Sequence, residues 1–267
     1  MALGASPPVA QVVTATTESE TLPAAAPRGH AGTAAPERAP LRLAATLLVA
    51  GELLSLLVGA LHPDREPANS HPAVFAEYAA SAHWTAVHLG QFAGLAVVVA
   101  GLLVLSRALN VAAGVPGWAS RFGAGAAAVA LALYGVLQAV DGVALKQAVD
   151  AWARAPAADK AARFASAEAL RWLEGGVRSY HSVTLGLALL LLATASGWTG
   201  RVPRPVGYLM GLSGLAYLVQ GVVLGAEGFS ARNGLPTLLG ILTVLAWSVW
   251  LLVTAWRMPG PVEAGRP

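Results

Sequence analysis

Histidines and acids at the ends of apolar runs are the residues of this sequence best suited to chemistry. His88 and His181 stand near the start of two such runs, and Asp141 stands near the end of another. Neutral imidazole and carboxylate groups bind Zn²⁺ and similar ions, and an ion with a bound water can hydrolyse esters or amides. His88, His181 and Asp141 are therefore candidate metal ligands, and such a site could hydrolyse a lipid or amide at the outer leaflet. The sequence contains no cysteine, which excludes thiolate metal sites, iron–sulfur clusters and disulfides.

Two other interpretations of the same histidines stay open. His88 and His181 could be the axial ligands of a haem b between the second and fourth apolar runs. Alternatively, histidines at a membrane boundary simply hydrogen-bond to loops and neighbouring acids, without a cofactor. His83 and His88 are five residues apart and do not share a helical face. The spacing of the histidines therefore matches no cofactor motif. The cofactor stays unknown, and the sequence favours the absence of a cofactor over a metal ion or haem.

Glu52 is the acid that lies deepest in an apolar run. It stands nine residues before Leu61, the end of its run, which at about 1.5 Å per residue is a depth of roughly 14 Å. A carboxyl group near the middle of a membrane is a candidate for carrying protons or coupling transport. A neutral Glu52 that hydrogen-bonds to a serine, a tyrosine or a backbone carbonyl explains the residue equally well.

The elements that must position these groups are six apolar runs. The chain of 267 residues is 56% hydrophobic and 12% charged, with a mean hydropathy of +0.60, whereas a soluble domain has about 25% charged residues. A helix needs about 20 apolar residues to cross a bilayer. We predict an all-α, polytopic transmembrane bundle with six spans, at residues 41–61, 83–105, 122–145, 177–198, 206–226 and 235–256. Residues 1–40 are expected to be a disordered N-terminal tail and residues 257–267 a C-terminal tail.

Residues 157–173, between the third and fourth spans, are predicted to form a surface amphipathic helix. Pro156 precedes a series of good helix formers, and Glu174 and Arg178 have the favourable i,i+4 order of an ion pair. Such a helix would lie along the membrane surface and cap the mouth of the bundle.

Polar residues inside the spans gather toward one side of the membrane. Odd spans end, and even spans begin, on the same face, and polar side chains recur there at helical spacing. Because such residues usually face the bundle interior, we expect a polar cavity in this half, open to the outside and sealed on the inner side. The candidate cavity residues are Glu52, His62, His88, Gln91, Gln138, Asp141, His181, Gln220 and Glu227.

Basic residues give the expected orientation. The side with both termini carries nine Lys or Arg and the other side eight, of which six lie between Lys146 and Arg178. Setting this long connection aside leaves nine against two, which favours cytoplasmic termini in an inner membrane. The pI of 9.6 comes from 17 Lys and Arg scattered over tails and loops, so we expect the lipid bilayer, and no nucleic acid, as partner.

Short motifs around the first loop carry a resemblance to known sequences. They are the His62-Pro63 exit from the first span, the loop His71-Pro-Ala-Val-Phe-Ala-Glu-Tyr78, and His88-Leu-Gly-Gln91 in the second span. With them, residues 41–256 resemble uncharacterised six-helix bacterial membrane proteins of domain-of-unknown-function families. The resemblance implies this fold and a bacterial source of high GC content, and it implies no activity.

Three classes of function fit these patterns. The first, which we favour, is binding of a small molecule or lipid in the outward-facing cavity. The second is a membrane-embedded enzyme that uses the histidines and acids, either as a metal-dependent hydrolase or as a haem redox protein. The third is an accessory subunit whose polar stripes meet a membrane partner or a second copy of the chain.

Overall fold

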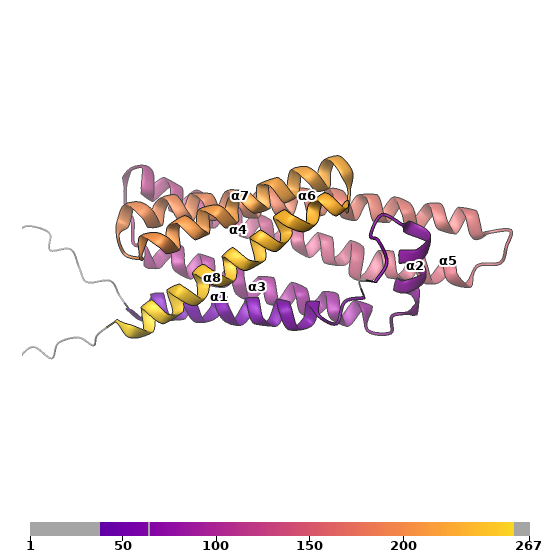
Figure 1. Cartoon of the computed structure of the whole chain (residues 1–267), viewed down its shortest axis with the longest axis horizontal. Coiled ribbons are helices and arrows are strands. Elements are labelled where there is room, and N and C mark those ends of the chain that lie inside the picture. Colours follow the sequence, from indigo (N-terminus) through magenta and orange to yellow (C-terminus); the bar gives the residue numbers. More distant parts are fainter. Residues whose placement is uncertain (1–37, 64, 259–267) are drawn as a thin grey trace, which may run out of the picture. The chain divides into compact units, whose positions relative to one another are not determined.

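The chain is all-helical, and six of its helices are long and apolar enough to cross a membrane. The computed structural model describes residues 38–63 and 65–258, and this part of the chain contains no strand (Figure 1). The predicted N-terminal tail up to residue 37, and the C-terminal tail from residue 259, lie outside the described residues. The spans are α1 (Arg38–Gly59), α3 (Trp84–Ala108), α4 (Gly114–Ala139), α6 (Lys160–Thr199), α7 (Arg204–Glu227) and α8 (Gly234–Arg257).

The spans form a ring in which each packs on the next, in the order α1, α3, α4, α6, α7, α8 and back to α1. Glycines bring two of these pairs into backbone contact. A Cβ on Gly51 of α1 would lie 2.7 Å from the carbonyl oxygen of Gly94 of α3, and a Cβ on Gly186 of α6 would lie 2.6 Å from that of Gly214 of α7. Small residues at such crossings are typical of helix pairs in membranes, where close packing replaces the hydrophobic effect.

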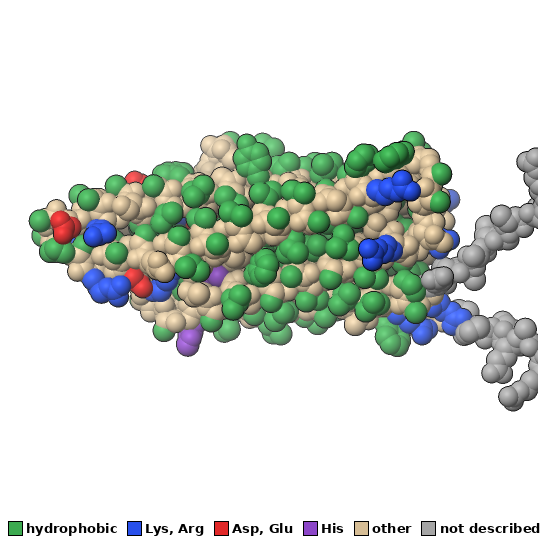
Figure 2. All heavy atoms as spheres, turned by 180° about the vertical axis from the view of Figure 1, so that it is seen from behind, with side chains coloured by type: hydrophobic (Ala, Val, Ile, Leu, Met, Phe, Trp, Pro, Cys, Tyr) green, Lys and Arg blue, Asp and Glu red, His purple; other side chains and the backbone are tan. Residues whose placement is uncertain are grey.

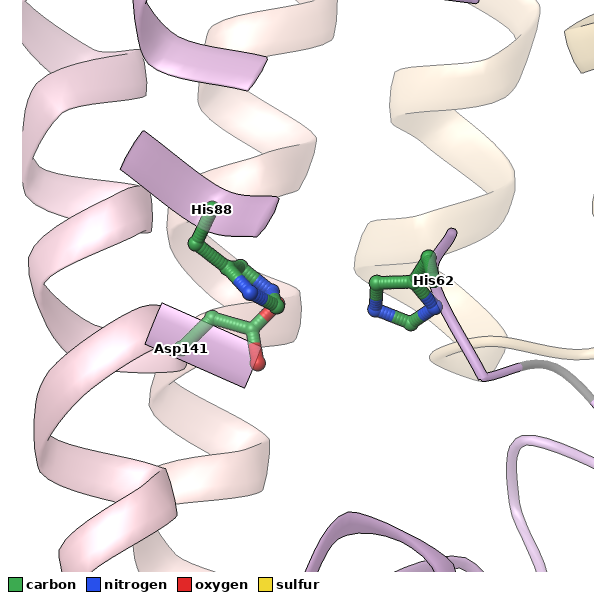
Figure 3. Close-up of side chains that lie close together, drawn as sticks. All are labelled: His62, His88 and Asp141. Atoms are coloured by element: carbon green, nitrogen blue, oxygen red, sulfur yellow. The ribbon is translucent and has the colours of Figure 1, made fainter. Parts of the chain in front are cut away.

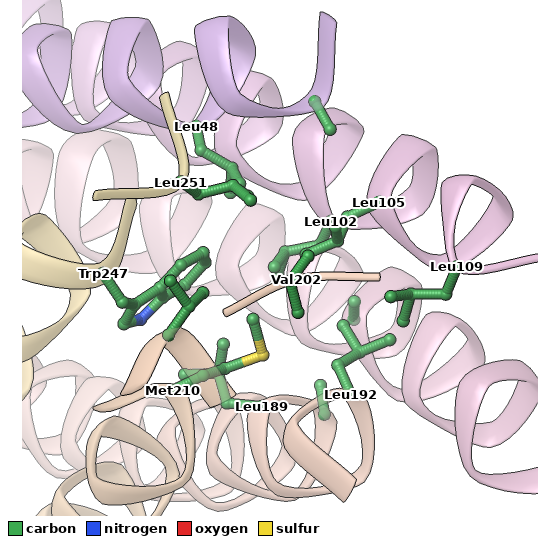
Figure 4. Packing of buried hydrophobic residues seen from close by; sticks show 14 of the residues in the cluster. Leu48, Leu102, Leu105, Leu109, Leu189, Leu192, Val202, Met210, Trp247 and Leu251 are labelled. Carbon is green, nitrogen blue, oxygen red and sulfur yellow. The ribbon is translucent and has the colours of Figure 1, made fainter. Parts of the chain in front are cut away.

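The half of the bundle near α1's start and α8's end is filled with apolar side chains. Leu48, Leu102, Leu192 and Trp247 are fully buried there and come from four different helices (Figure 4). Hydroxyl groups buried in this half bond to one another, as in the 2.8 Å contact between Ser213 and Thr243. This half of the ring is therefore closed by packed side chains.

The same end of the bundle carries arginines and no acid among the described residues. They are Arg38, Arg42, Arg107, Arg121, Arg201, Arg204 and Arg257. Arg42 Nε donates to the carbonyl of Ala255 at 3.1 Å, so it ties α1 to the last turns of α8. Figure 2 shows basic side chains gathered at this end and mixed with acids at the opposite one.

At the opposite end, two helices continue past the other spans (Figure 1). α4 runs through a π-helix, η1 (Val140–Leu145), into α5 (Lys146–Arg154), and α5 packs on the first part of α6. α6 has 40 residues and is about 60 Å long at 1.5 Å per residue, twice the hydrocarbon thickness of about 30 Å. Of the predicted surface helix at residues 157–173, residues 160–173 are helical, but they are the first part of α6 and not a separate helix along the surface. No proline separates them from the fourth span, so the helix continues.

We call the assembly of α2 (His71–Ala80), α5 and the first part of α6 the cap. Phe75 and Tyr78 of α2 are buried against Val149 of α5 and Ala167 of α6. Lys146 Nζ donates to the carbonyls of Tyr78 at 3.1 Å and Ala79 at 3.0 Å, which satisfies the C-terminal end of α2. The loop after α1 is thereby fixed over the end of the bundle.

Candidate functional site

A cavity of about 450 Å³ lies inside the ring of spans, and every span contributes to its lining. We call it the central cavity. Its polar lining consists of Glu52, Ser55, Gln91, Tyr134, Arg178, His181, Ser182, Tyr217 and Gln220. Its apolar lining includes Leu95, Leu102, Leu189, Val244 and Trp247, several of which belong to the packed half of the bundle. Polar residues from α1, α3, α4, α6 and α7 thus meet in one space that has an apolar floor.

Hydrogen bonds fix the wall that α6, α7 and α8 contribute to the central cavity. Ser182 Oγ donates to Gln220 Oε1 at 3.0 Å, and Gln220 Nε2 donates to Thr237 Oγ1 at 2.7 Å. Both ends of the Gln220 amide are therefore engaged, and the side chain is held in one orientation. His181 Nδ1 donates to the carbonyl of Ala130 at 2.9 Å, which leaves Nε2 of the neutral ring as an acceptor.

Two ionisable groups of opposite sign line the central cavity without a partner in the described part of the chain. They are Glu52 of α1 and Arg178 of α6, and neither forms a hydrogen bond or ion pair with another described residue. Charged groups in a membrane protein are costly unless they meet a partner or water. Both groups are therefore available to a ligand.

The central cavity opens between α1 and α8. Leu56 of α1 and Ala60, just after α1, line it and are also exposed on the surface of the bundle. α8 crosses the bundle obliquely, because Thr237 near its start bonds to α7 and Ala255 near its end bonds to α1 (Figure 1). α1 and α8 therefore meet at one end only, and residues 53–61, at the end of α1 and just after it, include no buried side chain.

A second group of polar residues lies where the bundle meets the cap. His88 Nε2 is 2.9 Å from Asp141 Oδ2, and His62, in the turn after α1, faces this pair (Figure 3). One ligand atom from each of the three residues lies within 4.8 Å of the others. His88 is 1% exposed and Asp141 is 9% exposed, so the pair is buried. We call His62, His88 and Asp141 the junction group.

The π-helix η1 explains how Asp141 reaches α3. A π-helix changes the direction of backbone carbonyls and side chains relative to an α-helix, and such segments are frequent at functional sites. Here Trp84 Nε1 donates to the carbonyl of Asp141 and Thr85 Oγ1 to that of Gly142, both at 2.8 Å. The side chains of α3 therefore hold η1 in place, with the Asp141 carboxylate next to His88.

The structure separates the nine candidate cavity residues predicted from the sequence. Glu52, Gln91, His181 and Gln220 line the central cavity, whereas His62, His88 and Asp141 form the junction group. Gln138 lies beside His88 in a small recess between α3 and α4. Glu227 pairs with Arg232 at 2.6 Å in the turn before α8 and is not among the residues that line the cavity.

The three predicted metal ligands are not all brought together. His88 and Asp141 are neighbours, but the third residue beside them is His62 and not His181. His181 lines the central cavity, while His88 lines the recess, so the two histidines considered as haem ligands belong to different spaces.

Arg178 lines the central cavity, although the sequence predicts a different role for it. The i,i+4 spacing predicts an ion pair with Glu174, but both oxygens of Glu174 accept from Arg171 Nη1, at 2.7 and 2.9 Å. Arg178 is three residues before His181, so the two share a helical face. The position of Arg178 in the cavity lining could have been predicted from this spacing.

Comparisons with known proteins gave no match, either to a protein-family model, to a curated protein or to a solved structure. The function is therefore inferred from the geometry of the two sites.

Proposed function

We propose that this chain is a multi-pass protein of a bacterial inner membrane that binds a small amphipathic molecule or lipid in the central cavity. The observation that carries the proposal is a cavity of about 450 Å³ whose lining contains the unpartnered Glu52 and Arg178. Pockets of roughly 300–1,000 Å³, mostly apolar with a few placed polar groups, are typical of small-molecule sites.

The lining favours a ligand with a polar head and an apolar body. Glu52 and Arg178 offer an acceptor and a donor of opposite charge, which suits a head group with both kinds of hydrogen-bonding atom. Leu102, Leu189 and Val244 offer a surface for the apolar body. Trp247 Nε1 is buried with no partner in the described part of the chain, so it is a further donor near the apolar floor.

The opening between α1 and α8 favours a ligand that arrives from the lipid phase. Leu56 is 38% exposed, lines the cavity and lies in the last turn of α1, at the end of the bundle that carries the cap. A ligand can therefore enter here at the outer interface, with its chain in lipid and its head group in water. We further propose that both termini lie in the cytoplasm and the cap lies outside, because the end of the bundle that carries only arginine matches the positive-inside rule.

The test identifies the molecule that co-purifies with the protein. The full chain is purified in mild detergent and extracted with organic solvent, and the extract is analysed by mass spectrometry. We expect one class of amphiphile in stoichiometric amount. Leu56→Trp, at the exposed edge of the lining, should lose most of it, because the indole fills the opening.

Leu57→Trp is the matched control. Leu57 is the next residue of α1, is 70% exposed and does not line the cavity, so this variant should retain the amphiphile. Equal amounts in the two variants, or no amphiphile above that held by an unrelated membrane protein, would contradict the proposal.

A second candidate function is favoured by the junction group. Two histidines and an aspartate are the ligand types of hydrolytic metal centres, so the chain could be a membrane-embedded metal-dependent hydrolase. This function predicts release of fatty acid from an ester- or amide-linked lipid by the Zn²⁺-loaded protein, and loss of that release in Asp141→Asn. Unchanged hydrolysis in Asp141→Asn would rule it out.

A further inference from the structure

The junction group brings three metal-binding side chains together from three separate segments. His62 comes from the turn after α1, His88 from α3 and Asp141 from η1 (Figure 3). Their ligand atoms lie within 4.8 Å of one another although the residues are far apart in the sequence. Two imidazoles and a carboxylate are the donors that divalent transition-metal ions prefer when no thiolate is present.

His88 is oriented as a metal ligand would be. Its Nδ1 is 2.7 Å from the carbonyl of Trp84, which can only accept, so the ring proton sits on Nδ1. Nε2 of the neutral ring then directs its lone pair at Asp141 Oδ2, 2.9 Å away. Two lone pairs at this distance need a proton or a cation between them. Metal-bound histidines usually donate their other N–H to a carbonyl or carboxylate in this way.

Asp141 supplies an independent observation. Its second oxygen, Oδ1, is buried and has no hydrogen-bond partner in the described part of the chain, and the residue is only 9% exposed. A buried carboxylate oxygen without a partner is costly. A cation held by the junction group would satisfy this oxygen as well as the lone pair of His88.

The surroundings of the junction group are closely packed. A Cβ on Gly142 would lie 2.5 Å from Cβ of His88, so only glycine lets η1 come this close to α3. The ring of Trp84 lies 4.4 Å from that of His88 and 4.8 Å from that of His62, measured between ring centroids. An apolar shell of this kind limits access of water to a bound ion and fixes its ligands.

We propose that His62, His88 and Asp141 bind a divalent transition-metal ion, with Zn²⁺ as the representative ion. Bonds of about 2.0 Å hold the ligand atoms of tetrahedral Zn²⁺ about 3.3 Å apart. The His88–Asp141 pair is already near that spacing, and His62 is partly exposed at the end of α1, where a small shift closes the site. Three protein ligands leave a fourth position for water or for a ligand donor. This inference is independent of what occupies the central cavity.

The test is Zn²⁺ binding to the full chain in detergent, after washing with a chelator and removal of any affinity tag. Titration against a competing chromophoric chelator should give one saturable site per chain. His62→Ala, Asp141→Asn and His88→Ala should each weaken binding at least about tenfold, the low end of the loss seen when even the outer shell of a metal site is altered. His83→Ala removes an exposed histidine at the start of α3 that is not in the junction group, and it should bind as the wild type does.

A second measurement shows whether a variant that fails to bind is still folded. Zn²⁺ should raise the melting temperature of the wild type and of His83→Ala, and it should leave that of Asp141→Asn unchanged, because an ion that binds only the folded state stabilises it. Co²⁺ bound to the wild type should show the visible bands of a four-coordinate site. The proposal would be overturned if the wild type showed no saturable Zn²⁺ binding. It would also be overturned if folded Asp141→Asn and folded His62→Ala bound Zn²⁺ as tightly as the wild type does.

Discussion

Replacing Gly142 by alanine tests whether close packing of η1 on α3 builds the junction group. The added Cβ would lie 2.5 Å from Cβ and 3.0 Å from Cγ of His88. Cβ of His88 is fixed to the backbone of α3 and cannot turn away as the end of a flexible side chain could. The two helices must therefore separate locally, and His88 moves away from Asp141.

The size of the effect follows from two opposing contributions. Overpacking of one methyl group in a packed interior costs about 1–3 kcal/mol, whereas alanine in place of glycine in a helix gains about 1 kcal/mol. Gly125→Ala is the matched control, because Gly125 lies on α4 and its added Cβ would meet nothing within 4 Å. The helix gain is common to both variants, so the free energies of unfolding should differ by the overpacking cost of about 1–3 kcal/mol.

The assay is denaturant-induced unfolding in detergent, followed by the Zn²⁺ titration on the same preparations. Gly142→Ala should be less stable than Gly125→Ala and should bind Zn²⁺ more weakly. A Gly142→Ala protein that is as stable as Gly125→Ala would refute the packing of η1 on α3. Wild-type Zn²⁺ affinity in a destabilised Gly142→Ala would instead refute the link between this packing and the junction group.

Three further predictions concern the cap and the bundle. Arg171→Leu leaves the buried Glu174 carboxylate unpaired and should destabilise the protein by about 3–5 kcal/mol in denaturant unfolding. The double variant Arg171→Leu/Glu174→Leu should recover most of that loss, and a double variant as unstable as the single one would contradict the buried pair. Lys146→Met frees the two carbonyls at the end of α2, so amide hydrogen exchange should become faster in residues 71–80 and stay unchanged in α3. Equal exchange rates in the wild type and the variant would show that α2 does not depend on this lysine. Gly186→Ala should lower the melting temperature, because its Cβ would lie 2.6 Å from the carbonyl oxygen of Gly214, whereas Gly197→Ala should not, because its Cβ would meet no atom within 4 Å. Similar melting temperatures for both variants would contradict the α6–α7 contact.

The positions of the spans could be predicted because contact with lipid acts directly on composition. The predicted fifth span, 206–226, compares with α7 at Arg204–Glu227, and the sixth, 235–256, with α8 at Gly234–Arg257. The continuation of α4 through η1 into α5 was not predictable. The polar residues after Leu145 look like a connection between spans, and a π-helix has no sequence signature.

The two sites differ in how much of them the sequence contains. Glu52, Gln91, His181 and Gln220 line the central cavity as predicted, because helical periodicity alone decides which face of a span a residue occupies. The partner of His88 and Asp141 depends instead on packing between segments distant along the chain. Nothing in the spacing of the histidines distinguishes His62 from His181.

Single cysteines test the central claim most directly, because the natural chain has none. Ser55→Cys places a thiol in the lining of the central cavity, and Ser213→Cys places one at a fully buried position in the packed half of the bundle. A membrane-impermeant methanethiosulfonate reagent reacts with thiolate in water and not with a thiol packed among apolar side chains. Ser55→Cys should be labelled rapidly from the side opposite the termini, and Ser213→Cys should not be labelled. Labelling of both at similar rates, labelling of Ser55→Cys only from the side of the termini, or no labelling of either would contradict a polar cavity open to the outside.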